Sequence, residues 1–123
     1  MTSKKVVLVM LALVVLAVLV PATARHGGVA SANNVGEKTL LDNDQVLVVE
    51  FVFPPGFKGD EHEAPVNEFA YVLDGEFSVV TKGLGKTVVK KGQVEFAPKG
   101  AVRYSLNETK RPARVLVVLL KER

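Results

Sequence analysis

Short runs of β-branched and aromatic residues, each ended by glycine or proline, recur through the C-terminal part of the chain. The first is Gln45 to Phe53 (QVLVVEFVF), which Pro54-Pro55-Gly56 ends. Such residues favour pleated strands, and turn residues about eight to twelve positions apart are typical of sandwiches and barrels. The further predicted strands are Glu68 to Leu73, Glu76 to Thr81, Lys86 to Lys90, Gln93 to Ala97 and Ala113 to Leu120. Because this region has no helical period, we predict an all-β fold.

Glycine-containing turns separate the middle strands. Asp74-Gly75 leaves only two residues between neighbouring strands, which predicts a two-residue hairpin. Alternate residues of a strand point to opposite faces, so about half of Phe51, Phe69, Phe77 and Phe96 should point inward and could fill the interior. Strand edges also need covering, and closure into a barrel or pairing across a homodimer would do this.

The N-terminal residues have the composition of a signal peptide. Lys4 and Lys5 precede an uninterrupted apolar run from Val6 to Val20, and Ala22-Thr23-Ala24 follows Pro21. The run is shorter than the roughly 20 residues that span a membrane, whereas a basic start and an A-x-A end are typical of secretory signals. We therefore expect cleavage after Ala24, a secreted or periplasmic mature protein, and no membrane attachment after cleavage.

Charge and composition limit the organisation and the partners that are expected for the rest of the chain. Residues 25–36 (RHGGVASANNVG) predict a flexible leader, and residues 37–123 the folded domain. Removal of residues 1–24 takes away two lysines, so the charge falls from +3 to +1. No run of like charge remains, and we expect no nucleic-acid partner. The chain has no cysteine, so packing alone must stabilise the domain.

Two segments carry a more specific signal. The first runs from Gly56 through His62, Ala64 and Glu68 to Gly75, and the second from Gly92 through Pro98, Gly100 and Arg103 to Asn107. Their spacing resembles the two conserved motifs of the cupin superfamily, G-x5-H-x-H-x3-4-E-x6-G and G-x5-P-x-G-x2-H-x3-N. This resemblance implies a jelly-roll β-barrel. The lead-in Asn43-Asp44-Gln45-Val46-Leu47-Val48 resembles the small periplasmic cupins of bacteria.

The resemblance also implies a divalent transition metal held by four side chains, and this chain departs from that pattern. His62 and Glu68 match two of the expected ligands, but Ala64 and Arg103 stand where the family has histidines. Loss of a residue that only supports a ligand already weakens metal binding about 10–100-fold. The permanent charge of Arg103 would also repel a metal ion. We therefore expect no tightly bound metal, and predict that Arg103 occupies the metal position and pairs with Glu68.

Several functions remain open at this point. If Arg103 keeps free donors, a pocket formed by Arg103, Glu68 and His62 could bind a small organic anion. If Arg103 and Glu68 only satisfy each other, the protein is a non-catalytic relative of the family or an assembly module. The alternative is a metal-dependent dioxygenase or isomerase that uses His62 and Glu68, with Asp60 as a third ligand on the same strand face as His62.

Overall fold

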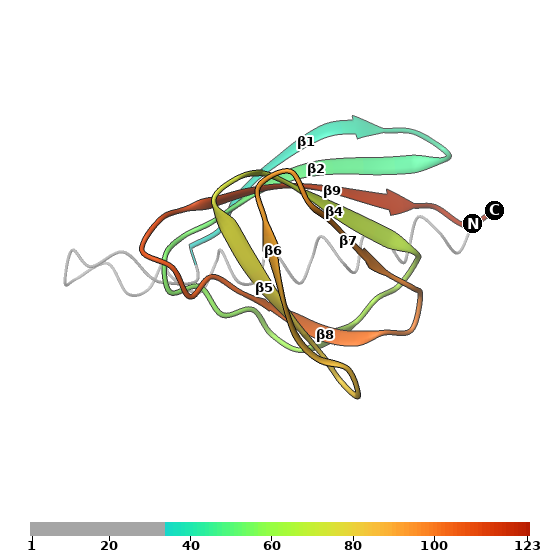
Figure 1. The fold of residues 1–123 in the computed structure, drawn as a ribbon. Coiled ribbons are helices and arrows are strands. Elements are labelled where there is room, and N and C mark those ends of the chain that lie inside the picture. The colour runs from blue at the N-terminus through green and yellow to red at the C-terminus, as the bar shows by residue number, and fades with distance from the viewer. Residues whose placement is uncertain (1–33) are drawn as a thin grey trace, which may run out of the picture.

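The computed structural model describes residues 34–123, which form two antiparallel β-sheets that enclose a common interior (Figure 1). The strands are β1 (Gly36–Asp42), β2 (Val46–Phe53), β3 (His62–Glu63), β4 (Glu68–Asp74), β5 (Glu76–Thr81), β6 (Gly85–Lys90), β7 (Val94–Ala97), β8 (Val102–Leu106) and β9 (Ala113–Leu120). Residues 34–123 contain no helix, and therefore none that could cross a membrane. The all-β prediction is confirmed.

The strand order explains how distant parts of the chain meet. One sheet has the order β1-β2-β9-β4-β7, and the other has the order β3-β8-β5-β6. At the middle of the first sheet, β2 and β9 pair along their whole length, from Val46 opposite Leu120 to Phe53 opposite Ala113. Each predicted motif contributes to both sheets: β3 of the first motif pairs with β8 of the second, and β4 of the first motif pairs with β7 of the second.

The core forms because the strands alternate between buried and exposed residues. On β2, Leu47, Val49, Phe51 and Phe53 are buried, and the residues between them are only partly buried. Val115 on β9 and Val79 on β5 complete the interior from both sheets. Each fully buried side chain of this kind contributes about 1.5–3 kcal/mol. These contributions stabilise a domain that has no disulfide bond.

The prediction of a hairpin at Asp74-Gly75 is wrong. β4 pairs with β7 and β9, whereas β5 pairs with β6 and β8, so the chain passes from one sheet to the other at this turn. Gly75 has a φ of 73°, and a Cβ atom there would lie 2.5 Å from the Pro112 carbonyl oxygen. Glycine is therefore needed at a corner between sheets. The turn between β5 and β6 does form a hairpin.

Strands β1 and β8 are absent from the predicted set, whereas an extended strand through Asp60 and His62 was expected, and β3 contains His62. β1 is mostly exposed and so has no alternating apolar pattern, and β3 has only two residues. Val35, within the predicted leader, is buried in the core. The predicted signal peptide (1–24) and the rest of the leader up to residue 33 lie outside the described residues, and these assignments stay predictions.

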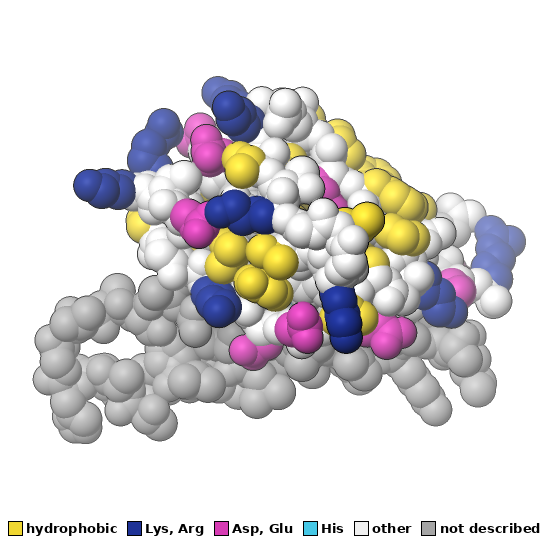
Figure 2. Space-filling view, turned by 60° about the horizontal axis from the view of Figure 1, so that its bottom comes forward, with side chains coloured by type: hydrophobic (Ala, Val, Ile, Leu, Met, Phe, Trp, Pro, Cys, Tyr) yellow, Lys and Arg dark blue, Asp and Glu magenta, His cyan; other side chains and the backbone are white. Residues whose placement is uncertain are grey.

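The surface has a mixed charge. Lys and Arg side chains lie among Asp and Glu side chains over the face shown in Figure 2, and this face has no continuous positive area. Lys99 pairs with Glu122 and Lys121 with Asp42. On the outer face of the five-stranded sheet, the register aligns a row of apolar residues, Leu41, Val48, Val118, Phe69 and Phe96. The homodimer stays a prediction.

Candidate functional site

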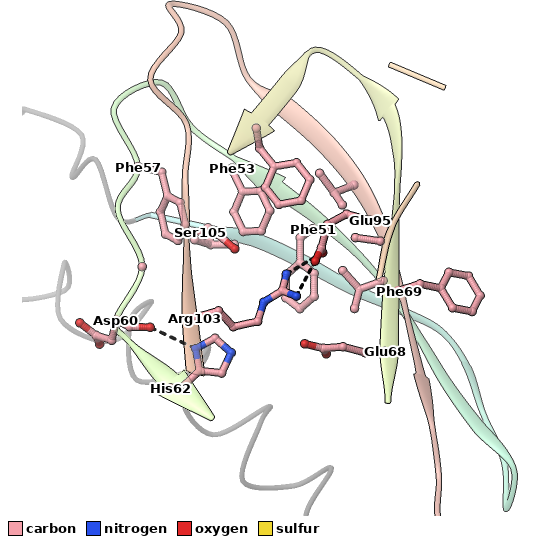
Figure 3. Close-up of a pocket in the computed structure, with 16 residues that line it drawn as sticks. Phe51, Phe53, Phe57, Asp60, His62, Glu68, Phe69, Glu95, Arg103 and Ser105 are labelled. Atoms are coloured by element: carbon pink, nitrogen blue, oxygen red, sulfur yellow. Dashed lines mark hydrogen bonds and ion pairs between the residues drawn. The ribbon is translucent and has the colours of Figure 1, made fainter. Parts of the chain in front are cut away.

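Four strands bring polar side chains to one region of the interior. On β3 and β8, His62 lies directly opposite Arg103 in the register, so both side chains leave the same face of that sheet. On β4, Glu68 has the same parity as the buried Ala70 and Val72. Glu95 on β7 lies opposite Ala70, which places Glu95 diagonally beside Glu68. All four polar residues line one cavity (Figure 3).

Arg103 pairs with Glu95, and the predicted pair with Glu68 is wrong. The Arg103 Nη1 and Nη2 atoms donate to the two Glu95 carboxylate oxygens at 2.6 Å each. Both side chains are largely buried, with 7% and 13% of their surface exposed. This two-bond geometry is the strong form of an arginine–carboxylate contact. Arg103 reaches across the interior to β7, and its terminal nitrogens are therefore engaged by a residue that the motif comparison did not include.

Sequence reasoning missed Glu95, although a signal for it was present. The predicted strand Gln93 to Ala97 contains a single carboxylate among apolar residues, and Glu95 shares parity with Ala97. Ala97 is buried, so the same face carries Glu95 into the interior. A charged residue that points into a barrel needs a partner of opposite charge. The pair of Glu95 with Arg103 provides it.

Glu68 is the unsatisfied group of the site. The residue is only 5% exposed, and its Oε2 atom is buried without a hydrogen-bond partner. Burial raises the pKa of Glu68 to about 7, with Arg103 acting to lower it and Glu95 acting to raise it. A buried carboxylate oxygen without a donor is rare, because most buried polar atoms are hydrogen-bonded. Glu68 thus presents an open acceptor to the cavity.

His62 lies at the rim of the same cavity. Its Nδ1 atom is 3.1 Å from the backbone carbonyl oxygen of Asp60. Because a carbonyl only accepts, Nδ1 must donate the proton, and Nε2 of the neutral ring is then an acceptor. In Figure 3 this second nitrogen lies on the side of the ring towards Glu68. In its neutral form, His62 therefore offers a second acceptor at the polar end of the cavity.

The residues of this site do not fit the divalent metal that the family motifs imply. Between residues 34 and 123, no three His, Cys, Asp or Glu side chains are close enough to hold a metal ion together. The predicted third ligand, Asp60, faces His62 with its backbone carbonyl and not with its carboxylate. Ala64 is buried and has no donor atom. His62 and Glu68 remain, beside a permanently charged guanidinium.

The other end of the cavity is aromatic. Phe53 stacks on Phe57 with ring centroids 4.8 Å apart, and Phe51 and Phe77 lie 5.8 and 5.7 Å from Phe53. Phe51 and Phe77 point inward as predicted for about half of the phenylalanines, whereas Phe96 is 56% exposed. They leave a cavity of about 110 Å³ open. A single water requires at least about 10–15 Å³, so the cavity has room for a small organic molecule.

Asn107, just beyond the end of β8, has a different environment. Its Nδ2 atom donates to the carbonyl oxygens of Phe53 and Arg111 at 3.0 and 2.7 Å. Its Oδ1 atom accepts from the backbone nitrogen and the hydroxyl of Thr109 at 3.0 and 2.7 Å. The side chain is fully buried. The last residue of the second motif therefore joins β2, β8 and the turn before β9.

Comparisons with known proteins agree with this architecture. The family described as "Cupin domain" matches residues 49–119. A cupin superfamily protein from Desulfitobacterium hafniense has 21% identity, covering 76% of this chain and 84% of that chain, with a TM-score of 0.66. A cupin family protein with a double-stranded β-helix fold from Methanocaldococcus jannaschii has 16% identity, covering 71% and 80%, with a TM-score of 0.66.

A third solved structure is an enzyme. The polyketide cyclase RemF from Streptomyces resistomycificus has 26% identity, covering 72% of this chain and 66% of that chain, with a TM-score of 0.66. No curated protein sequence matches the chain. The comparisons thus confirm the predicted jelly-roll barrel, while the fold alone does not separate catalytic from non-catalytic proteins.

Proposed function

This chain belongs to the cupin family, and we propose from that premise that its barrel binds a small organic molecule without the help of a metal ion. The cavity has a polar end at Glu68 and His62 and an aromatic end at Phe51, Phe53 and Phe57. Ligand sites in proteins combine an apolar lining with a few polar groups in this manner. The sequence of residues 1–24 supports a secreted or periplasmic location for this binding.

The observation that carries the proposal is the unpartnered Oε2 atom of Glu68. An unsatisfied buried polar atom costs about 1–3 kcal/mol, and more when it is charged. Arg103 is engaged by Glu95 through both terminal nitrogens, although it lies beside Glu68 in the same cavity (Figure 3). A ligand that donates a hydrogen bond to Glu68 would remove this cost. Glu68 would then be explained as a ligand-binding residue of the barrel and not as part of an inert core.

The donor set argues against the metal-dependent dioxygenase or isomerase. Two metal-binding histidines of the family pattern are replaced by Ala64 and Arg103, and Asp60 does not compensate for them. The guanidinium of Arg103 supplies the positive charge that a metal ion would otherwise bring to Glu95 and Glu68. We therefore propose a binding protein, with no catalytic residue assigned.

The prediction of a small organic anion depended on free donors at Arg103. The pair with Glu95 uses one N–H of each terminal nitrogen, and Glu68 adds a second carboxylate nearby. An anion would approach two carboxylates and one guanidinium, which together offer no net positive charge. The cavity therefore favours an uncharged or positively charged ligand over an anion.

Two measurements on the purified protein test this function. The first is elemental analysis after incubation with iron, manganese, nickel and zinc salts, followed by dialysis. The second is an NMR screen of small aromatic and aliphatic compounds, read from the amide signals of residues that line the cavity. We expect less than one metal ion per chain, and shifts that cluster around the cavity.

A pair of variants makes the screen specific. Val117→Phe narrows the cavity, because Val117 lines it, whereas Val118→Phe adds the same ring to the opposite face of β9. Binding should be lost in the first variant and kept in the second. One tightly held ion per chain that is lost in His62→Ala would instead favour the metal-dependent enzyme over the metal-free binding protein.

A further inference from the structure

We propose, on the basis of the proposed function, that the ligand is a small organic cation: an ammonium group at Glu68 and His62 joined to an apolar body that packs on the phenylalanines. The class follows from three features of the cavity. These are its charge balance, the hydrogen-bonding roles of its polar atoms, and the chemistry of its wall.

The charge balance leaves one carboxylate without a cation of its own. Arg103 lies at the centre of the polar end and forms two hydrogen bonds with Glu95, so this pair is close to neutral. Glu68 lies on the same sheet face as Glu95, diagonally across β4 and β7. With Glu68 ionised, as it is above its pKa of about 7, two carboxylates and one guanidinium carry a net charge of −1. The complementary ligand has a charge of +1.

Two of the polar atoms that remain open are acceptors, beside the N–H groups of Arg103 that Glu95 does not use. Glu68 Oε2 has no donor, and His62 Nε2 becomes an acceptor once Nδ1 donates to Asp60. A carboxylate ligand has no proton to give to either atom. An ammonium group has three N–H donors and no acceptor, so it matches both atoms at once. A hydroxyl group could satisfy only one of them.

The aromatic end of the cavity suits the apolar body of such a cation. Phe51, Phe53 and Phe57 form a stacked series, with neighbouring centroids 5.8 and 4.8 Å apart. Aromatic faces attract cations and also bury apolar surface. Apart from the four polar residues described above, Asp60 at the rim and Ser105 are the polar side chains of the lining. The body of the ligand should therefore be apolar and carry one amine.

Three probes of the same ring size and different charge test the inference on the wild-type protein. They are benzylamine, benzyl alcohol and benzoate, titrated while the amide signals of cavity residues are followed by NMR. We expect benzylamine to bind at least about tenfold more tightly than benzyl alcohol, because a charge-assisted hydrogen bond replaces a neutral one. Benzoate should give no saturable shifts at the cavity.

Two carboxylate variants locate the effect. Glu68→Gln keeps the shape and removes the charge, so the preference for benzylamine over benzyl alcohol should fall to about twofold or less, while benzyl alcohol still binds. Glu63→Gln is the matched control, since Glu63 lies next to His62 on β3 but is exposed. It should keep the full preference. A thermal unfolding transition of each variant verifies that it is folded.

The outcomes separate this inference from the proposed function. Equal or tighter binding of benzyl alcohol or benzoate would overturn the cation class and leave a small-molecule site in place. Unchanged benzylamine preference in Glu68→Gln would also overturn it, because the ammonium would then bind elsewhere. If neither these probes nor any compound of the wider screen shifted the cavity signals, both proposals would fail together.

Discussion

The two ends of β8 carry buried polar residues whose environments differ. Asn107, beyond the C-terminal end, makes four hydrogen bonds and is fully buried. At the other end, Arg103 pairs with Glu95 through both terminal nitrogens, but Glu68 beside it retains an oxygen without a donor. Asn107 and Glu68 are both buried, with 0% and 5% of their surface exposed. What differs is whether the protein itself completes the hydrogen bonds.

The difference distinguishes a structural polar residue from a functional one. A fully satisfied network rigidifies the core and specifies one arrangement of its strands. A partly satisfied network costs stability, and natural proteins accept that cost mainly at functional sites. Asn107 can thus be explained without any ligand. Glu68 needs a molecule that is not part of the chain.

The largest expected effect follows from removal of Arg103. In Arg103→Met, two buried carboxylates lose the guanidinium between them, and the free energy of unfolding should fall by about 3–5 kcal/mol at pH 8. The measurement is urea unfolding followed by circular dichroism. Arg114→Met is the control, because its pair with Glu50 is half exposed and should matter little. Equal losses in both variants would show that burial of the Arg103 pair adds nothing.

Loss of Asn107 should have the next largest effect. Asn107→Ala removes four hydrogen bonds and takes the Nδ2 donor away from the Phe53 carbonyl oxygen, whereas the Arg111 carbonyl oxygen can still accept from the Thr109 hydroxyl. We expect the free energy of unfolding to fall by about 3–4 kcal/mol, from the same urea curves. The matched control is Asn67→Ala, in which an exposed side chain loses one bond to the Lys99 backbone. A decrease of about 1 kcal/mol or less is expected there. If both substitutions had the same small effect, Asn107 would not join the strands as described.

The sequence could predict which polar residues belong to the motifs, but it could not predict which carboxylate pairs with Arg103. Motif spacing identified Asn107, His62 and Glu68, and apolar alternation identified strands such as β2 and β9. Both are local patterns, and local patterns are carried directly by the order of residues. The pairing of Arg103 with Glu95 depends instead on how far one side chain reaches across the barrel. Glu68 and Glu95 both lie on the sheet opposite Arg103, and only the three-dimensional arrangement shows which of them it pairs with.

The same limit explains the wrong hairpin at Asp74-Gly75. Two strands with a two-residue connection satisfy the hairpin pattern, but β4 already has neighbours on both edges, β7 and β9. These neighbours come from distant parts of the chain, so no short sequence window contains them. β1 was missed for the opposite reason, since its exposed residues lack the alternation that burial imposes.

The third prediction concerns the pH dependence of stability. The pKa of Glu68 rises on folding from 4.5 to about 7. Between these values the folded protein holds a proton that the unfolded chain has lost. Stability is therefore complete below about pH 4.5 and decreases as the pH rises to 7, by up to about 3 kcal/mol in total. Above pH 7 this contribution no longer changes.

Glu68→Gln isolates that contribution, because glutamine does not titrate. The difference in unfolding free energy between wild type and variant should depend on pH only between about 4.5 and 7, with the variant relatively more stable at the higher pH. Urea unfolding at several pH values measures it. If the unfolding free energies of the two proteins changed with pH in parallel, Glu68 would have a hydrogen-bond donor in solution. The contrast between a satisfied Asn107 and an unsatisfied Glu68 would then be wrong.

The smallest expected effect on stability is that of a His62 substitution, which tests whether His62 belongs to the binding site. His62 is partly exposed, and its single hydrogen bond goes to the neighbouring Asp60 backbone. His62→Ala should therefore lower the free energy of unfolding by less than about 1 kcal/mol, while benzylamine binding weakens because one of two acceptors is lost. A structural role would give the opposite result, with a large loss of stability and intact binding. His62→Gln retains a polar side chain and should recover part of the affinity. This pattern would place His62 in the binding site together with Glu68. A residue that contributes to binding but little to stability has its hydrogen bonds satisfied by the ligand and not by the fold.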